Sequence, residues 1–375
     1  MLSEVNSCPV LAALGNPLYD MSVQVADDYF IEKYGLNRDG QLEINSATLE
    51  VISLDIKKKE LPFSSSPGGT SQNTLRVYQW LTNKPFHTVI FGSVGDDENA
   101  KLLEEKVEND LVVTRYARNQ GKPTGTTICF INGVIRTLIA HLGAAKSYPI
   151  NAFSVPENLS VFSTLQVLYI EGFFVMHDIE TAVKAVSLCY QNGVTVAFNL
   201  SGVYILNKYH KEVLYMASLA DIVVGNRSEY TEAARYFNCK NRQDLKIVMH
   251  DLKSLKLPSP IQERSDLQLD IKAEIRNKVV ADNRKILLMT QDKDPVLCLY
   301  GENTFLEVKV EKIEEGVIKD TTAAGDSFFA GFIAGIIAEK NIEESINLGN
   351  KAARMIIQQI GCTLPSKDSK YKISV

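Results

Sequence analysis

The sequence lacks the cysteine and histidine patterns of metal centres and disulfide frameworks. Its six cysteines are scattered with no C-x-x-C pair, and its five histidines include no H-E-x-x-H. A structural zinc site and a histidine-ligated metal centre are therefore not expected. Scattered, unpaired cysteines suit the reducing cytosol or nucleus better than an oxidising compartment. We expect a cytoplasmic protein, with nuclear residence as the alternative.

The sequence also has no excess of positive charge and no apolar run of membrane-spanning length. Forty basic residues face 45 acidic ones in 375 residues, for a net charge of −5. Without a basic patch, a nucleic acid partner is not expected. The most apolar segment ends at Glu339-Lys340, well short of the roughly 20 residues that a span needs, and the N-terminus has no signal-peptide pattern. We expect no membrane partner, and a monomer.

Short apolar runs alternate along the chain with segments of helical periodicity. This alternation predicts an α/β fold in which a mainly parallel sheet is covered by helices on both faces. The runs end in small or polar residues, and ligands of such sheets bind beyond the carboxyl ends of the strands. The six runs begin at Val10, Thr88, Leu165, Val194, Asp221 and Lys285.

Two regions depart from this rhythm. Residues Asp20 to Ser66 hold broken apolar stretches, and Thr124 to Ala140 reads as a β-hairpin with Asn132-Gly133 as its turn. We expect these regions to form a small sheet apart from the large one. The charged stretch from Asn238 to Asn283 is interpreted as a solvated excursion from the large domain.

The segment "DTTAAGDSFFAGFIAGIIA", from Asp320 to Ala338, places one carboxylate in front of an apolar helix. The tiny residues Ala323, Ala324 and Gly325 precede Asp326 and leave the N–H groups at the helix start open to a ligand. Such N–H groups and the helix dipole attract anions such as phosphate. Asp326 would then take a proton from a group that attacks the phosphate. The structural alternative is an ordinary N-cap on a core helix.

Three further motifs hold candidate site residues. The structural alternatives are a flexible loop with an exposed Asn73 for the first, a loop capped or solvated by Asp20 for the second, and a helix cap for the third. "SSPGGTSQN" places Gly68-Gly69 ahead of a helix whose first turn carries Asn73. Asp20, in "GNPLYDMS", lies just past a strand end, where a carboxylate can bind a sugar diol. "VVGNRSE" gives Asn226 and Glu229 the spacing of a capping box, or of a pair that orders magnesium and its waters near phosphate.

These motifs, taken together, resemble the ribokinase-like carbohydrate and nucleoside kinases. "DTTAAGDSF" is similar to the C-terminal signature of that family, and "PGGTSQN", "VGNRSE" and "GNPLYD" resemble its other landmarks in the same order. Further details, including "PTGTT", "RTLIAHLGAA", "YIEGFF" and "IGCTLP", resemble the adenosine kinases within the family. The resemblance spans about Leu14 to Pro365.

The resemblance implies a single ribokinase-like unit with a three-layer αβα domain and a small β lid. The large domain would comprise about 67–115 and 141–375 with the first strand, 9–16, and the lid about 17–66 and 116–140. The implied reaction is phosphorylation of adenosine at its 5′-hydroxyl by ATP, with Mg²⁺, to give AMP and ADP. Closure of the lid would exclude water from the reaction.

The resemblance also implies a role for each matching residue. Asp326 would be the general base, and the N–H groups of Ala323, Ala324 and Gly325 the anion hole, with Arg136 reaching the phosphates from the lid. The ribose would contact Asp20, Gly68, Gly69 and Asn73. Asn226 and Glu229 would manage magnesium, the former through water. The adenine would be surrounded by Leu18, Gln41, Leu138, Ala140, Leu142 and Phe174, and the ATP site bordered by Asn226, Thr290, Gln291, Thr322 and Asn350.

Several positions depart from the family pattern. Ala323 and Asp292 stand where glycine is usual, Glu171 where a small residue is common, and Thr127 and Tyr204 differ from common pocket residues. These departures keep two alternatives open. One is a kinase for another nucleoside or for a sugar. The other is a weakly active member of the family that binds nucleoside.

Overall fold

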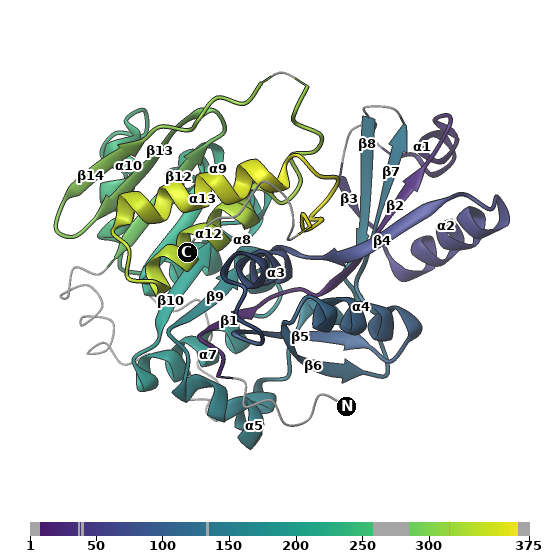
Figure 1. Cartoon of the computed structure of the whole chain (residues 1–375), viewed down its shortest axis with the longest axis horizontal. Coiled ribbons are helices and arrows are strands. Elements are labelled where there is room, and N and C mark those ends of the chain that lie inside the picture. Colours follow the sequence, from purple (N-terminus) through teal and green to yellow (C-terminus); the bar gives the residue numbers. More distant parts are fainter. Residues whose placement is uncertain are drawn as a thin grey trace.

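A computed structural model describes residues 8–36, 38, 41–132, 135–257, 285–314 and 316–366, with the backbone alone described at 41, 135 and 136. Its described strands form two sheets, and Figure 1 shows the smaller sheet projecting from one side of the larger. The predicted division into a large α/β domain and a small sheet is thus confirmed.

The large sheet has the order β14-β13-β12-β11-β10-β9-β1-β5-β6. All pairs from β12 to β6 are parallel, whereas β13 and β14 pair antiparallel at one edge. Each of the six predicted apolar runs forms one strand of the parallel part. The strands are β1 (Leu11–Leu14), β5 (Thr88–Gly95), β6 (Val113–Asn119), β9 (Val167–Glu171), β10 (Thr195–Asn199), β11 (Ile222–Asn226), β12 (Ile286–Gln291), β13 (Asp294–Tyr300) and β14 (Thr304–Val308).

Helices cover both faces of this sheet, because alternate strand residues are apolar on each side and contribute to two separate cores. One core packs against α3 (Thr70–Thr82), α4 (Glu98–Asn109), α12 (Ala324–Ile337) and α13 (Ile342–Ile356). The other packs against α6 (Gly172–Val175), α7 (Ile179–Asn192), α8 (Val203–Leu219), α9 (Arg227–Ala233) and α10 (Leu245–Lys253). Further short helices are α5 (Pro156–Leu159), η1 (Gly143–Lys146), η2 (Ile150–Ser154) and η3 (Ser160–Ser163).

The apolar helix α12 is a core element. Phe328, Phe329, Phe332 and Ile333 are buried on it. Its G-x-x-x-G pattern serves packing against α13, since a Cβ at Gly331 would lie 2.5 Å from the carbonyl oxygen of Leu348. In the part of the chain that the structure describes, no helix is long and apolar enough to cross a membrane.

The small sheet has the order β3-β8-β7-β2-β4 and carries two helices on one face. Its hairpin is the predicted one, with Asn132 opposite Ile135 in the β7–β8 ladder. Apolar residues of β2, β7 and β8 pack beneath the helices in a third core. The elements are β2 (Leu18–Gln24), α1 (Tyr29–Tyr34), β3 (Gln41–Glu43), α2 (Ser46–Lys58), β4 (Phe63–Gly68), β7 (Thr126–Asn132) and β8 (Ile135–His141).

Two expected boundaries need correction. Residues 116–119 were expected in the lid, but β6 pairs with β5 from Val113 through Asn119 and belongs to the large sheet. The lid sheet also extends past residue 66, since β4 pairs with β2 as far as Gly68. Each strand thus belongs to one sheet for its whole length, and composition does not mark where the chain passes from one sheet to the other.

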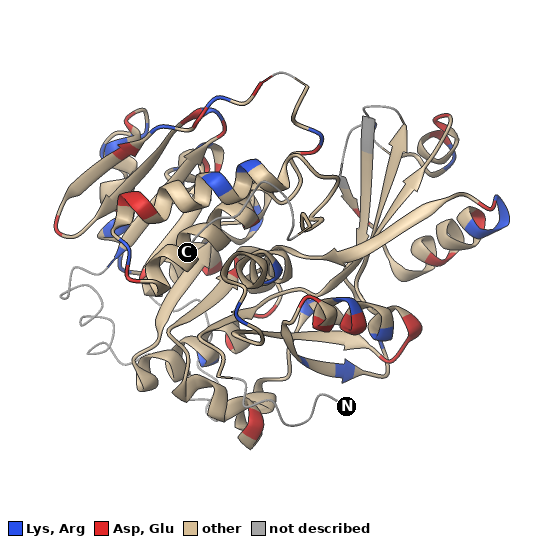
Figure 2. Ribbon diagram, viewed as in Figure 1, with Lys and Arg blue, Asp and Glu red and all other residues tan. Residues whose placement is uncertain are grey.

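The charged stretch after Asn238 is only partly as expected. Its helix α10 buries Val248, Met249 and Leu252 against the large core, so this part is not a solvated excursion. Residues 258–283 lie outside the described residues. Elsewhere charged residues of both signs share the same helices, as Figure 2 shows for α4 and α13.

Candidate active site

Asp326 lies in the first turn of α12, close to the carboxyl ends of the central strands. The helix begins at Ala324, and its N-cap is Ala323, which makes no side-chain capping bond. Asp326 is therefore not the N-cap, and the structural alternative for this carboxylate fails. Gly325 is exposed, and a Cβ built on it would meet no heavy atom within 4 Å. The small residues thus leave open space in front of the helix N-terminus.

Ala323 occupies the left-handed region at φ 61°. A side chain there costs roughly 1–2 kcal/mol, which explains why glycine is usual at this position. The preceding Asp320 holds the loop in place: its Oδ1 accepts from Thr322 N at 2.9 Å and its Oδ2 from Gly361 N at 2.7 Å. Asp320 thereby ties the loop ahead of α12 to the segment that follows α13.

The Asp326 carboxylate is half-buried and faces Asn73 on α3. Asn73 Nδ2 donates to Asp326 Oδ2 at 3.1 Å. Burial raises the pKa of Asp326 to about 7, an effect that hydrogen bonds from Asn73 and Thr70 partly offset. A carboxylate with this pKa is better matched to proton transfer near neutral pH than an ordinary aspartate.

Asp20 approaches the same place from the lid strand β2. A Cβ at Gly68 would lie 2.1 Å from the Asp20 carboxyl group, so only glycine permits this contact. Gly69 has φ 91° and lies against the Asn16 carbonyl, which again requires glycine. Burial raises the pKa of Asp20 to about 7, while a hydrogen bond from Thr127 and the charge of Arg76 lower it.

Glu171, at the end of β9, is a buried anchor between three segments. One of its oxygens accepts from Asn16 N at 2.8 Å, after β1. The other accepts from Ser71 N at 2.7 Å and Ser71 Oγ at 2.8 Å, in the first turn of α3. Burial raises the pKa of Glu171 to about 7. Glu171, which stands where the family commonly has a small residue, thus adds hydrogen bonds that connect β9 to the segment after β1 and to α3.

Asn226 and Glu229 form the capping box of α9. Glu229 N donates to Asn226 Oδ1 at 2.9 Å, and Glu229 Oε2 accepts from Asn226 N at 2.8 Å. Glu229 is nevertheless buried beside the cavity, and burial raises its pKa to about 7. The capping role and a place at the site therefore coexist.

A cavity of about 150 Å³ lies at the strand ends, and its lining does not include Asp20, Asn73 or Glu171. It brings together Asp326 and Gly325 from α12 with Asn226 and Glu229 from the start of α9. The remaining lining residues are Thr70, Phe173, Asn199, Ser201, Val224, Gly225 and Thr290.

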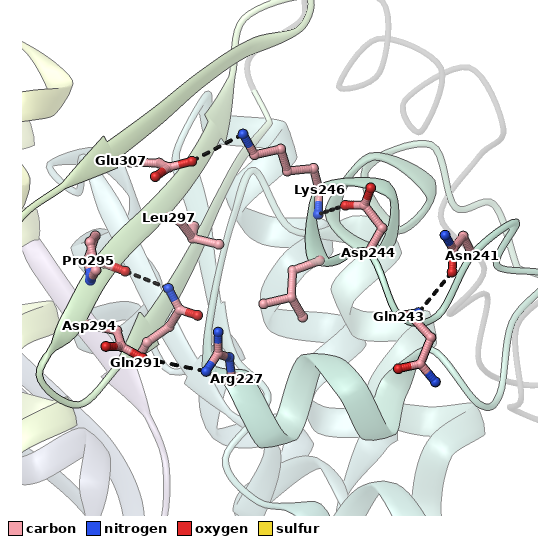
Figure 3. A pocket seen from close by; sticks show the side chains of 11 residues that line it. Arg227, Asn241, Gln243, Asp244, Lys246, Gln291, Asp294, Pro295, Leu297 and Glu307 are labelled. Atoms are coloured by element: carbon pink, nitrogen blue, oxygen red, sulfur yellow. Dashed lines mark hydrogen bonds and ion pairs between the residues drawn. The ribbon is translucent and has the colours of Figure 1, made fainter.

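A larger cavity of about 560 Å³ is lined by Gln291 of β12 and by residues of α9, α10, β13 and β14 (Figure 3). Thr290 lines the small cavity and Gln291 this one, since successive strand residues point to opposite faces. Gln291 Nε2 donates to Pro295 O at 2.6 Å, so its side chain is held at the larger cavity. The cations of this cavity are paired: Arg227 with Asp294 at 3.5 Å and Lys246 with Glu307 at 3.1 Å.

The residues expected around the adenine fall into three groups. Leu18, Leu138 and Ala140 are half-buried on the lid face opposite its helices, and Leu142 follows β8. Phe174 is instead fully buried in the large core, and its neighbour Phe173 lines the cavity. The burial of Phe174 argues against its expected contact with adenine, whereas the neighbouring Phe173 is open to a ligand. The side chain of Gln41 lies outside the described residues, as does that of Arg136, which was expected at the phosphates.

Two residues expected at the ATP site, Thr322 and Asn350, line neither of the two cavities. Thr322 is exposed in the loop before α12. Asn350 is half-buried on α13, and its Nδ2 atom is enclosed without a hydrogen-bond partner. A buried amide nitrogen without an acceptor is unusual and is compatible with a ligand contact.

The model of the pfkB family of carbohydrate kinases matches residues 43–257 and 263–369. The chain belongs to this family. It is 28% identical over 368 residues to adenosine kinase 2 of Arabidopsis thaliana, covering 98% of this chain and 99% of the relative.

Solved structures of adenosine kinases have the same fold. Adenosine kinase of Anopheles gambiae, in complex with a di(adenosine-5) tetraphosphate, is 28% identical, with a TM-score of 0.79 over 95% of this chain and 98% of that one. Adenosine kinase of Schistosoma mansoni in complex with adenosine is 26% identical, with a TM-score of 0.78 over 96% of this chain and 97% of that one. The predicted ribokinase-like fold and family are thereby confirmed.

Three residues that line or support the candidate site were not predicted from the sequence of this pfkB family member. Asp320 anchors the loop, Phe173 lines the cavity, and Arg76 lies buried on α3 beside Asn73. The first two fall within the motifs "DTTAAGD" and "YIEGFF", which could have suggested them. Arg76 gives no such signal, because a charged residue in a helix usually faces solvent.

Proposed function

We propose that the protein transfers the γ-phosphoryl group of ATP to the 5′-hydroxyl of adenosine, giving AMP and ADP. The observation that carries the proposal is the placement of Asp326. Its carboxylate lies at an open helix N-terminus and accepts a hydrogen bond from Asn73. Burial raises its pKa from the usual aspartate value to about 7. Adenosine is inferred as the substrate because this chain is similar to adenosine kinases over nearly its whole length.

In this mechanism Asp326 takes the proton of the 5′-hydroxyl as the oxygen bonds to phosphorus. The N–H groups of Ala323, Ala324 and Gly325 stabilise the charge that develops on the transferring phosphoryl oxygens. Phosphoryl transfer depends mainly on positioning and charge stabilisation, and an open helix N-terminus beside one carboxylate provides both. Arg136 reaches the phosphates when the lid closes.

The acceptor is held between the lid and α3. Asp20, Gly68, Gly69 and Asn73 bind the ribose, because carboxylate and amide groups suit its hydroxyls. The purine lies against the open face of the lid, among Leu18, Gln41, Leu138, Ala140, Leu142 and Phe173. Closing the lid excludes water, which would otherwise hydrolyse ATP.

ATP lies on the opposite side of Asp326, bordered by Asn226, Thr290, Thr322 and Asn350. Gln291 contributes through its backbone at the end of β12, since its side chain points elsewhere. Mg²⁺ bound with the nucleotide would supply positive charge to the phosphates. Both Glu229 oxygens already accept from Asn226, so Glu229 and Asn226 fit a role through water better than direct coordination.

An acceptor panel tests this assignment. The purified protein is given ATP and Mg²⁺ with adenosine, guanosine, ribose or fructose, and the products are separated by chromatography. AMP formed from adenosine, with kcat/KM well above that of the other acceptors, is the expected result. Preference for a sugar would assign the site to a carbohydrate kinase. The absence of transfer to any acceptor would contradict a kinase function.

A further inference from the structure

Arg76 is a buried cation that joins four separate segments next to the acceptor side of the site. It is 5% exposed and lies on α3. Its Nε donates to Asp110 Oδ2 at 2.6 Å, at the end of α4. Its Nη1 lies 3.2 Å from Cys362 O, 3.4 Å from Pro67 O and 3.5 Å from Asn73 Oδ1, and its two hydrogens are shared among these three acceptors.

The guanidinium favours one orientation of the Asn73 amide. Arginine has five donors and no acceptor, so the amide oxygen of Asn73 must face it. The amide nitrogen then faces the other way, and it donates to Asp326 Oδ2 at 3.1 Å. With the amide reversed, its oxygen would face the Asp326 carboxylate and its nitrogen the guanidinium. Arg76 and the Asp326 carboxylate therefore favour the same orientation of the Asn73 amide.

The same guanidinium supports the other acceptor residues. Pro67, whose carbonyl it binds, directly precedes Gly68, and Gly68 lies against the Asp20 carboxyl group. The positive charge also favours the ionised form of Asp20, whereas burial and the charge of Asp326 oppose it. None of the four hydrogen-bond partners of Arg76 is among the residues assigned to ATP, such as Asn226 or Thr290.

We propose that Arg76 is a positioning residue for the acceptor. It holds Asn73 and the Gly68-Gly69 turn so that the acceptor hydroxyls meet Asp326 in a fixed geometry, and it acts on the acceptor without acting on ATP. The proposal rests on the proposed function for the identity of that acceptor, adenosine. A purely structural arginine would be needed equally for both substrates.

Steady-state kinetics with adenosine and ATP varied in turn test the proposal. Arg76→Met should raise the KM for adenosine by about tenfold or more, the factor that corresponds to the loss of one charge-assisted hydrogen bond. The KM for ATP should stay within about twofold of the wild-type value, which is the size of change expected from a substitution that makes no contact with ATP. Arg76→Lys keeps the charge without the planar fork and should give an intermediate KM for adenosine.

A double-mutant cycle shows whether Arg76 acts through Asn73. If it does, Arg76→Met combined with Asn73→Ala should raise the KM for adenosine little more than the stronger single variant. Fully additive effects would overturn the proposal. So would equal rises in KM for both substrates, or no change at all. If Arg76→Met does not fold, as judged by circular dichroism, Arg76→Lys takes its place in the cycle.

Asp110→Asn is the matched control. It removes the charge of a partner that is not among the acceptor residues and keeps an oxygen that accepts from Arg76, so the KM for adenosine should change little. Wild-type turnover of adenosine is measured first, and its absence would refute the proposed function. Wild-type turnover together with an unaltered Arg76→Met variant would refute only the role of Arg76.

Discussion

Replacing Gly325 by alanine adds one methyl group at the open N-terminus of α12. No heavy atom lies within 4 Å of the new Cβ, so the fold has room for it. Gly325 is in the first turn of the helix, where alanine is favoured over glycine by roughly 0.5–1 kcal/mol. The variant should therefore be slightly more stable than the wild type, with a melting temperature about 1–2 °C higher.

Activity should change in the opposite direction. The methyl group points into the space where the account places the transferring phosphoryl group, and it hinders access to the backbone N–H groups. Loss of one such donor typically costs about 10²–10³-fold in kcat. Gly121→Ala is the matched control, because Gly121 is exposed and a Cβ there would meet only Asn119 Oδ1, at 3.6 Å.

The assay combines thermal denaturation with kcat for AMP formation at saturating adenosine and ATP. Raised or equal stability with a kcat lower by at least about tenfold is expected for Gly325→Ala, against an unchanged kcat for the control. A wild-type kcat in Gly325→Ala would show that no phosphate approaches this turn, and the anion-hole assignment would be refuted.

Three further predictions concern pH, the buried anchor and the nucleotide site. Because burial raises the pKa of Asp326 and Asp20 to about 7, kcat/KM should rise with pH through about 7 and then level off; an acid limb near pH 4 would contradict this. The folded state then holds protons that the unfolded chain has lost, so these groups should lower the free energy of unfolding as pH rises from about 4 to above 7, measured by urea denaturation at several pH values. Glu171→Gln, which disturbs three buried hydrogen bonds, should cost about 1–3 kcal/mol of unfolding free energy, and an unchanged urea midpoint would refute the anchor. Asp292 is exposed at φ 51° and directly follows Gln291 at the expected ATP site. Asp292→Gly should relieve backbone strain and remove a negative charge that repels the triphosphate, so the KM for ATP should fall, whereas a higher KM would indicate a contact between Asp292 and the nucleotide.

The parallel part of the fold is well predicted because its signal is local. Each of six apolar runs forms one buried strand, and Asn132-Gly133 correctly indicated a hairpin. The antiparallel edge strands β13 and β14 were missed, since they follow β12 as short, mixed segments in which pairing rather than composition decides the structure. The lid boundary at residue 116 failed for a similar reason, because β6 pairs with β5 as far as Asn119.

The candidate site is predictable where a motif is continuous in sequence. The segment from Ala323 to Asp326 and the pair Asn226 and Glu229 were found in this way, and the structure brings Asp326 and Glu229 to one cavity. The supporting bonds were not predictable, since Glu171 reaches Ser71 over 100 positions and Arg76 reaches Cys362 over 286. The choice between Phe173 and Phe174 depended on which of two adjacent rings faces the core.

The central claim is that Asp326 accepts the proton of adenosine during phosphoryl transfer from ATP. The direct measurement compares AMP formation by the wild type and Asp326→Asn under saturating substrates, with adenosine affinity determined by calorimetry for both. The account predicts ATP-dependent AMP formation by the wild type. For Asp326→Asn it predicts a kcat lower by at least about 10²-fold with nearly unchanged adenosine affinity. Near-normal AMP formation by Asp326→Asn, or binding of adenosine without any AMP formation by the wild type, would contradict it.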